Sequence, residues 1–368
     1  MEIEEARAEI AAIDREMAGL FERRMAAAES VAAWKKERGL PILDKAQEER
    51  VLERNSALVS DLKKRGLYLS FQREVMRLSR QYQHRLIEGA RVSYSGVEGA
   101  FAQIAAARIF PDAQLTACPS FEAAYQAVVR GDCVSAVLPI ENSYAGEVGQ
   151  VMDLMFDGPL HVNGVYDMAI DHCLLGVSGA ALSDVRTVIS HPQALSQCHT
   201  YLLRHGLEAQ GVSNTAIAAQ TVANAGDRSF AAIASAETAA LYGLRILDRH
   251  INESRANTTR FAVFSAAEAA GHSESGAFLL LFTVSDEAGG LAKAINVIGA
   301  HGFNMRVLRS RPMRKLPWHY YFYVEVEGSD ASEGGKRMLR ELRGVCRTIK
   351  VAGRYTSAES ALQGGESI

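Results

Sequence analysis

Residues 91–110 read RVSYSGVEGAFAQIAAARIF, and this stretch decides how the middle of the chain folds. Its first six residues are typical of a β-strand, and the alanine-rich part that follows is typical of a helix. Gly96 and Gly99 stand at the junction, where a tight turn would present backbone N–H groups to an anion. Their GxxG spacing, with no acidic residue placed to bind a ribose, argues against a dinucleotide site.

The same alternation of short apolar runs and alanine-rich runs continues to residue 264. Strands are expected at RVSYSG, QLTACP, SAVLPI, RTVISH, FAAIAS and FAVF, with helices in the alanine-rich stretches between them. Alternation of this kind predicts a largely parallel α/β architecture. We expect residues 90–270 to form two lobes, as in periplasmic binding proteins, with a ligand cleft between them.

Residues 1–89 differ in composition, since the first 88 hold 17 Lys and Arg, 16 Asp and Glu, and few glycines. This composition predicts an all-helical unit. In its first segment apolar residues recur with heptad spacing, at Ile10, Ile13, Met17, Leu20, Ala27, Val31 and Trp34. A helix continued to Arg38 would be roughly 50 Å long. One unit of this size cannot bury so long a stripe, which predicts a homodimer or a higher even oligomer.

Glycine and proline divide the rest of the helical unit. Gly39 and Pro41 break the first helix, and a second helix is expected from Asp44 to Arg65, ended by Gly66. A third helix is expected from Ser70 to Glu88. The unit is therefore expected to contain three helices.

Cations interrupt the apolar stripe of the first helix. Arg24 occupies an a position between Leu20 and Ala27, where a charge is costly unless an anion pairs with it. Arg7 and Lys35 flank the same helix at e positions. Solvated flanking charges, with Arg24 fixing the register of the seam, would also explain these three residues.

The other two helices add an acid, a hydroxyl and an amide. Ser79 and Gln83 lie four residues apart and make a polar notch in an apolar stripe, which a helix–helix hydrogen bond would also explain. Asp44 and Gln47 fit a capping box, and Glu48 is the first acid inside that helix. Together with the cations, these groups would suit a small dianion that carries a hydroxyl.

The helical unit resembles the all-helical chorismate mutases, which are intertwined dimers whose long first helix spans both protomers. The matching positions are Arg7, Arg24, Lys35, Asp44, Glu48, Ser79 and Gln83. The resemblance implies that Lys35 and Gln83 donate to the ether oxygen of chorismate, which gains negative charge in the rearrangement. It also implies that Arg24, with a partner subunit's arginine at the position of Arg7, binds the carboxylates, while Glu48 binds the hydroxyl. The reaction is pericyclic, so no cofactor is expected.

Gln47 departs from the pattern of this family, which usually has a second arginine before the glutamate. A neutral amide there removes one positive charge from the pocket, and we expect a weakened mutase. The alternative is an inactive helical unit that serves only as a dimerisation arm.

Polar residues also mark three junctions of the central region: PIENS (139–143), SHPQ (190–193) and NTTRF (257–261). Ligand sites form where the carboxyl ends of parallel strands meet, although helix caps and a polar strand entrance would explain the same residues. The ten histidines show no Ser-His-Asp order and no metal-ligand spacing, so no metal site is expected.

These segments resemble the prephenate dehydratases through SGxEGAF, PIENSxxGxV, DHCLL (171–175), SHPQALxQC and TTRFxVF. The resemblance implies that Thr259 offers a hydroxyl to the departing ring hydroxyl of prephenate, and that Arg260 binds or orients the acid substrate. The residues it places around the cleft are Ser95, Glu98, Asn142, Ser143, His191 and Gln193. A two-lobed solute-binding or sensing module is the alternative, against which the polar NTTRF entrance argues.

Residues 276–356 follow a β-α-β-β-α-β order, which predicts a ferredoxin-like fold, and residues 357–368 are expected to form a mobile tail. A linker is expected at 272–277. This module resembles the ACT regulatory domain, which usually binds phenylalanine for feedback inhibition. The matching residues are Gly289, Gly290, Leu291, Ala292, Arg309, Ser310, Arg311 and Pro312. Arg309 stands where the family usually has glutamate, so phenylalanine inhibition is expected to be altered or weak. The order of the three modules is that of the bifunctional P-proteins of phenylalanine biosynthesis.

Composition excludes several other classes. The net charge of -3 without a basic patch argues against nucleic-acid binding, and no apolar run reaches the ~20 residues of a membrane span. Five scattered cysteines without a CxxC pair indicate a reducing compartment. The acidic, helix-like start differs from a signal peptide, so a cytoplasmic location is expected.

Overall fold

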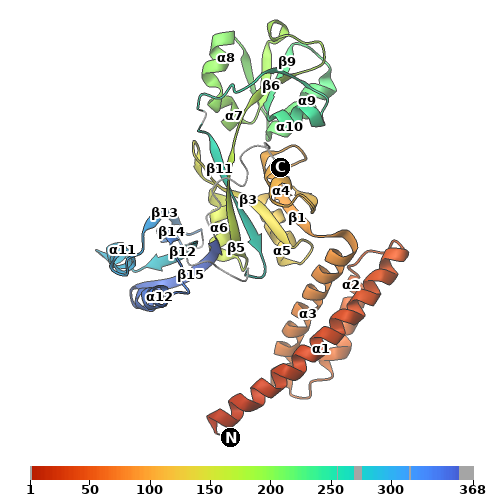
Figure 1. Cartoon of the computed structure of the whole chain (residues 1–368), viewed down its shortest axis with the longest axis vertical. Coiled ribbons are helices and arrows are strands. Elements are labelled where there is room, and N and C mark those ends of the chain that lie inside the picture. Colours follow the sequence, from red (N-terminus) through yellow and green to blue (C-terminus); the bar gives the residue numbers. More distant parts are fainter. Residues whose placement is uncertain (1, 255, 269–275, 315, 356–368) are drawn as a thin grey trace. The chain divides into compact units, whose positions relative to one another are not determined.

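The computed structural model describes residues 2–254, 256–268, 276–314 and 316–355 (Figure 1). By its internal contacts the chain divides into two compact units. The first comprises residues 1–91 with the short segments 112–114 and 130–134, and the second comprises the rest. The predicted tail from residue 357 lies outside the described residues, as does most of the predicted linker at 272–277.

Three helices make up most of the first unit: α1 (Ile3–Glu37), α2 (Lys45–Ser56) and α3 (Leu62–Glu88). α1 has two glutamates in its first turn and two lysines in its last, so its charges complement the helix dipole. α2 begins where the Asp44 carboxylate accepts a hydrogen bond from the N–H of Gln47 at 2.9 Å, which is the predicted cap.

The predicted boundary between the second and third helices is wrong. α2 ends at Ser56 rather than Arg65, and Gly66 lies inside α3 instead of ending a helix. The physical reason is Asp61, whose carboxylate accepts a hydrogen bond from the N–H of Lys63 at 2.9 Å and caps a new helix. The cap outweighs the weak helix propensity of one glycine.

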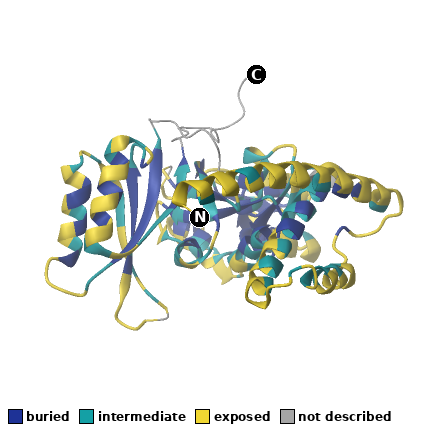
Figure 2. Ribbon diagram, turned by 90° about the horizontal axis from the view of Figure 1, so that it is seen from below, coloured by how far each residue is buried: buried dark blue, intermediate teal, exposed yellow. Residues whose placement is uncertain are grey.

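The apolar stripe of α1 lies largely at the surface of the single chain. Ile10 is 59% exposed, Leu20 57% and Trp34 50%. Among the described residues of this helix, Ala28 and Ala32 are the buried ones, and α1 packs on α3. Figure 2 accordingly shows long stretches of the helices as exposed.

The central region of the second unit begins with one sheet and its three helices. The sheet contains β1 (Arg91–Ser95), β2 (Gln114–Cys118), β3 (Ser135–Asn142), β4 (Gly146–Glu147), β5 (His161–Ala169) and β11 (Thr258–Ser265). The helices are α4 (Phe101–Ile109), α5 (Phe121–Val129) and α6 (Gly149–Asp157).

A second sheet forms the other lobe. It contains β6 (Cys173–Gly176), β7 (Thr187–Ser190), β8 (Glu208–Gly211), β9 (Phe230–Ala234) and β10 (Arg245–Asp248). Its helices are α7 (Pro192–Gln197), α8 (His199–His205), α9 (Thr215–Ala225) and α10 (Ala236–Leu241), with a 3₁₀ turn η1 (Leu182–Asp184). Neighbouring residues of β9 belong to different apolar clusters, Ala232 with α9 and Ile233 with α7 and α8, so helices cover both faces.

The prediction of a largely parallel arrangement needs correction. β1 pairs with β3, and β7 with β8 and β9, in parallel. β11, however, runs antiparallel to both β3 and β5, and β6 runs antiparallel to β9 and β10. The chain crosses from the first sheet to the second after β5 and returns as β11, and the returning strand inserts in the opposite direction. Both sheets are therefore mixed.

The C-terminal module has the predicted ferredoxin-like topology. Its elements are β12 (Ala277–Val284), α11 (Gly290–Ala300), β13 (Met305–Pro312), β14 (Tyr320–Glu327), α12 (Glu333–Val345) and β15 (Cys346–Tyr355). The antiparallel strands lie in the order β13-β14-β12-β15, and one apolar cluster joins them to both helices.

This module and the first sheet are continuous, because β15 pairs with β5. The contact is between Gly353 and Val162, where a Cβ on the glycine would overlap the carbonyl oxygen of Val162. Only glycine allows so close an approach of the two backbones. Across the described part of the chain, no helix is long and apolar enough to span a membrane.

Candidate active sites

A cavity of about 280 Å³, largely open to solvent in the single chain, lies among the three helices of the first unit. Six of the seven residues expected to form the mutase pocket line it: Arg24, Lys35, Asp44, Glu48, Ser79 and Gln83. Because they come from all three helices and from the loop before α2, the helical fold itself brings them together. The cavity thus has the cations, acids, hydroxyl and amide that the sequence predicts.

Several of these side chains are held in place by hydrogen bonds. Arg24 donates from Nη1 to the hydroxyl of Ser79 at 2.8 Å, and Lys35 donates from Nζ to the carbonyl oxygen of Ile42 at 2.5 Å. Gln83 is only 9% exposed, and among the described residues its Oε1 atom has no hydrogen-bond partner. A buried polar atom without a partner costs about 1–3 kcal/mol. This oxygen can only accept, so the atom of Gln83 that could donate to an ether oxygen is Nε2.

The sequence analysis did not place Arg80 in the cavity. This residue follows Ser79 on α3, lines the same cavity, and places Nη1 2.5 Å from Oε1 of Glu48. Arg80 was missed because α3 carries many charged residues, and the sequence does not show which of their side chains point into the unit. Gln47 also lines the cavity, and its Oε1 accepts two hydrogen bonds from Arg50, at 3.1 and 2.8 Å.

Arg7 is not among the residues that line this cavity. It pairs with Glu4 at 2.7 Å, and its side chain is 68% exposed. Arg7 precedes Arg24 by 17 residues in one helix, a separation of roughly 25 Å at 1.5 Å per residue. It cannot reach the cavity of its own chain.

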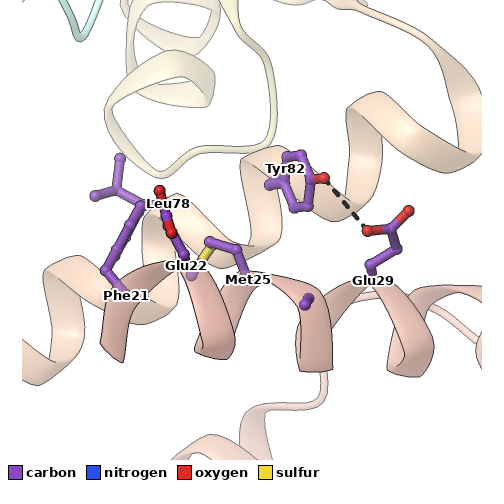
Figure 3. Close-up of a pocket in the computed structure, with 7 residues that line it drawn as sticks. Phe21, Glu22, Met25, Glu29, Leu78 and Tyr82 are labelled. Atoms are coloured by element: carbon purple, nitrogen blue, oxygen red, sulfur yellow. Dashed lines mark hydrogen bonds between the residues drawn. The ribbon is translucent and has the colours of Figure 1, made fainter. Parts of the chain in front are cut away.

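A larger hollow of about 480 Å³ lies between α1 and α3 (Figure 3). Phe21, Met25 and Leu78 give it an apolar lining. Tyr82 donates to a carboxylate oxygen of Glu29 at 3.5 Å along one side. Among the described residues no arginine or lysine lines this hollow, so it is unsuited to bind a dianion.

In the second unit, Asn142 and Thr259 form the centre of a polar cluster. Asn142 ends β3, Thr259 stands opposite it in β11, and both are buried. Oδ1 of Asn142 accepts hydrogen bonds from the backbone N–H groups of Tyr144 and Ala145 at 3.0 and 2.9 Å. Because those groups can only donate, the Nδ2 atom must face the other way, toward Oγ1 of Thr259 at 2.9 Å.

This orientation determines what the threonine hydroxyl can do. Oγ1 of Thr259 accepts the hydrogen bond from Asn142, so its own proton is left to be donated elsewhere. Gln193 of α7 donates from Nε2 to Oδ1 of Asn142 at 3.2 Å, which ties the second lobe to this amide. Residues of both lobes therefore position one hydroxyl donor.

A second layer of buried polar residues supports the cluster. Asn257 accepts from Asn142 at 2.9 Å and donates to Oε1 of Gln197 at 3.1 Å. Nε2 of His172 lies 2.9 Å from the same Oε1 atom. Burial lowers the pKa of His172 below its ordinary value of 6.5, so the ring is neutral and donates from Nε2. The quoted motifs contain all three residues, but we assigned none of them to the site.

The other expected residues lie around this centre with different partners. Nδ1 of His191 accepts a hydrogen bond from the N–H of Gln193 at 3.2 Å, and burial lowers the pKa of this histidine. The hydroxyl of Ser143 is exposed and accepts from the N–H of Thr258 at 2.9 Å. Ser95 ends β1, and Glu98 is exposed in the turn that follows. Within the described residues, no hydrogen bond joins Ser95 or Glu98 to the cluster.

The placement of Arg260 corrects the expectation that it joins Thr259 in the site. Successive residues of a strand point to opposite faces, so Arg260 points away from the side that carries Thr259. Its Nη1 lies 2.7 Å from the buried Glu325 of β14, and its Nε lies 3.3 Å from Asp167. Arg260 therefore joins the first sheet to the C-terminal module.

The expected regulatory residues fall into two separate segments. Gly289 caps α11 with φ 83°, and a Cβ on Gly290 would lie 2.5 Å from the carbonyl oxygen of Ser285. Leu291 packs on the apolar cluster, whereas Ala292 is exposed. In the described residues no hydrogen bond joins this segment to residues 309–312.

Two arginines of the second segment contact the first sheet and α6. Arg309 lies 3.2 Å from Glu141, the residue before Asn142. Arg311 pairs with Glu147 at 2.8 Å and with Asp153 at 3.2 Å, while Ser310 and Pro312 are exposed. Both arginines are thus occupied by carboxylates of the same chain.

Comparison with known proteins decides between the possible families. Residues 92–269 match the family model described as prephenate dehydratase, and residues 6–84 match chorismate mutase type II. The bifunctional chorismate mutase/prephenate dehydratase of Escherichia coli strain K12 is 34% identical over 275 residues, covering 73% of this chain and 71% of the relative. The chain belongs to the family of bifunctional chorismate mutase/prephenate dehydratases. It carries a mutase module followed by a dehydratase module.

Further relatives cover a similar share of the chain. The arogenate dehydratase/prephenate dehydratase 2 of Arabidopsis thaliana is 36% identical over 275 residues, covering 72% of each protein. Among solved structures, the protein GqqA, described as a novel type of quorum quenching acylase, is 31% identical with a TM-score of 0.68, covering 73% of this chain and 98% of that one. The prephenate dehydratase of Arthrobacter aurescens, solved with L-Phe, is 24% identical with a TM-score of 0.69, covering 73% and 90%, and shows the same fold.

The orientation of the Asn142 amide yields a testable prediction. Asn142→Asp keeps the size of the side chain but replaces the donor to Thr259 with a carboxylate oxygen, toward which the threonine proton would turn. We expect prephenate turnover to fall by about a hundredfold, as when one preorganised donor is lost. The measurement is phenylpyruvate formation from prephenate.

Asn163→Asp on β5 is the matched control, since Asn163 donates to the carbonyl oxygen of Ala267 and lies outside the polar cluster. It should leave turnover near that of the parent chain, and unchanged circular dichroism and thermal unfolding would show that both variants fold. An Asn142→Asp variant that keeps most of its turnover would show that this amide does not orient the hydroxyl.

Proposed function

We propose that the helical module rearranges chorismate to prephenate and that the central module converts prephenate to phenylpyruvate with Thr259 as the hydrogen-bond donor. The observation that carries this proposal is the Asn142–Thr259 bond at 2.9 Å, which leaves the threonine proton to be donated outward. Neither step as proposed requires a group beyond the side chains already described. The two modules would then catalyse consecutive reactions.

In the mutase cavity, the side chains would catalyse the reaction by holding the substrate in its reactive conformer and by stabilising the charge that develops. Arg24 and Lys35 would hold the compact conformer of the dianion, and Glu48 would accept a hydrogen bond from its hydroxyl. The ether oxygen gains negative charge as its bond to carbon breaks, and Lys35 and Gln83 would donate to it. Asp44 caps α2, which carries Glu48, and Ser79 orients Arg24. These two residues would therefore position the residues that contact the substrate.

In the dehydratase, two bonds of the prephenate ring break. The electron pair of the bond to the ring carboxylate moves into the ring and expels the hydroxyl on the opposite ring carbon as hydroxide. Carbon dioxide and hydroxide leave as the ring becomes aromatic. A threonine is too weak an acid to protonate the leaving group outright, so Thr259 would stabilise the departing oxygen by a hydrogen bond.

We favour prephenate over arogenate as the substrate. One relative is named for both substrates, and the two differ in carrying a keto or an amino group on the side chain. The chorismate mutase module at residues 6–84 would supply prephenate to the same protein. A mutase weakened by Gln47 remains the alternative for the first step.

One experiment tests both activities. Purified protein is incubated separately with chorismate, prephenate and arogenate, and loss of substrate and formation of phenylpyruvate or phenylalanine are followed. We expect Thr259→Val to lower prephenate turnover by about a hundredfold or more, because the shape is kept and the donor is lost. Chorismate consumption should be unchanged.

Thr258→Val is the control for this substitution, because among the described residues the Thr258 hydroxyl donates only to the carbonyl oxygen of Ala256, at 3.4 Å. It should turn over prephenate like the parent chain. Absence of phenylpyruvate from supplied prephenate would refute the dehydratase. Prephenate turnover without loss of chorismate would leave the helical module as a dimerisation arm.

The exposed stripe of α1 supports a homodimer in which each cavity is completed by the other chain. Ile10 and Leu20 are exposed in the single chain, and Arg7 is too far along α1 to reach its own cavity. Antiparallel packing of two α1 helices would bury the stripe and bring the partner's Arg7 to the cavity.

Mixing two inactive variants tests this assembly. Arg7→Ala and Gln83→Ala should each lose mutase activity, and an equal mixture, unfolded and refolded together, should recover about a quarter of the parent activity. The reason is that half of the dimers are mixed, and each mixed dimer contains one complete site. A mixture as inactive as its components would show that Arg7 does not act across the interface.

We also propose that the C-terminal module is an ACT domain whose response to phenylalanine is weakened. Its ferredoxin-like topology and the L-Phe bound by the Arthrobacter aurescens relative support the assignment. Arg309 supports the weakening, since the resemblance implies an acid at this position beside the ligand's ammonium group, and an arginine that pairs with Glu141 cannot take that role.

Titration of dehydratase activity with phenylalanine checks this prediction. We expect little inhibition below about 1 mM, the concentration that corresponds to a binding free energy of only about -4 kcal/mol. Tyrosine and tryptophan serve as comparison ligands. Strong inhibition by micromolar phenylalanine would contradict the expected effect of Arg309.

A further inference from the structure

Arg80 is a cation of the mutase cavity for which the family pattern provides no role. Its side chain is only 16% exposed, although arginine is usually found at the surface. Nη1 lies 2.5 Å from Oε1 of Glu48, and Nη2 donates to the carbonyl oxygen of Arg130 at 3.1 Å. A guanidinium has five N–H donors, and these two contacts leave three of them for a ligand.

The charge of the cavity requires a further cation. Within one chain its lining carries the cations Arg24, Lys35 and Arg80 and the acids Asp44 and Glu48, which leaves a net charge of one positive unit. A cation from the partner chain would raise this to two and balance a dicarboxylate. Without Arg80, the same set would fall one unit short, and burying the second carboxylate would be costly.

Position 47 cannot supply the missing charge. Gln47 lines the cavity from α2, but it is neutral, and its Oε1 accepts two hydrogen bonds from Arg50. Arg80 faces the same cavity from α3 and contacts Glu48, the neighbour of Gln47 in sequence. A guanidinium on α3 thus reaches the part of the cavity where the family usually has one on α2.

We propose that Arg80 is a substrate-binding residue of the mutase, which donates to a carboxylate of chorismate in place of an arginine at position 47. The proposal rests on the mutase activity proposed above. Its contact with Glu48 would also orient the carboxylate that accepts from the substrate hydroxyl. On this basis Gln47 does not weaken the mutase, because the positive charge that the family usually carries at position 47 comes from Arg80 on α3 instead.

A double-mutant cycle tests whether Arg80 replaces an arginine at position 47. Arg80→Gln, Gln47→Arg and the double variant are compared with the parent chain by kcat/KM for chorismate. We expect Arg80→Gln to lower kcat/KM by about a hundredfold, the usual loss for one charged donor. Gln47→Arg should raise kcat/KM of the Arg80→Gln variant at least about tenfold and that of the parent by a clearly smaller factor, because the two positions supply one charge between them.

Arg77→Gln is the matched control, because Arg77 is a similarly buried arginine of α3 that pairs with Glu74 and does not line the cavity. It should leave kcat/KM close to that of the parent. Prephenate turnover and the helical circular dichroism signal of each variant show whether the chain is folded.

Three results would overturn the proposal. The first is an Arg80→Gln variant that is folded and nearly as active as the parent. The second is a double variant no better than Arg80→Gln, which would assign Arg80 a structural role. The third is a Gln47→Arg substitution that raises activity equally in both backgrounds, which would make the two positions independent. A parent chain that does not consume chorismate would instead refute the mutase activity itself.

Discussion

The dehydratase module depends on the orientation of one side-chain amide. Two backbone N–H groups, which can only donate, fix the orientation of the Asn142 amide. This orientation determines the direction of the other hydrogen bonds that the amide makes in the cluster. The amide nitrogen then faces Thr259, and the amide oxygen also accepts from Gln193 of the second lobe. A hydroxyl that would otherwise rotate freely is held as a donor, which lowers the reorganisation needed during the reaction.

Side chains of β3 and β11 point alternately to two faces of the sheet, and the two faces have different roles. Asn142 and Thr259 are opposite each other on two neighbouring strands, and so are Glu141 and Arg260. Because adjacent residues of a strand point to opposite faces, the first pair builds the polar cluster and the second pair faces the C-terminal module. A displacement of β3 relative to β11 would therefore disturb both at once.

The sequence predicted the helical unit, the six strands RVSYSG to FAVF and the ferredoxin-like module because each has a strong periodic pattern. It missed the short strands β4, β6, β8 and β10, and also the longer β5. In β5, His161, Asn163 and Asp167 interrupt the apolar residues, and pairing with two neighbours is not visible locally. Heptad positions singled out Arg24 and Lys35, and the resemblance to chorismate mutases supplied the other residues that line the same cavity. Arg260 and Arg80 were harder, because a charged residue's direction depends on which partners the fold brings near it.

The continuity of β15 with β5 has a consequence for how these modules can be separated in evolution. A shortened chain that ended before β12 would leave the β5 edge without its neighbour and the Arg260 guanidinium without Glu325. Unpaired sheet edges promote aggregation, and Arg260 would keep only the acids of the first sheet, Asp167 and Glu141, as partners. Loss of the C-terminal module would therefore expose the β5 edge unless another segment covered it.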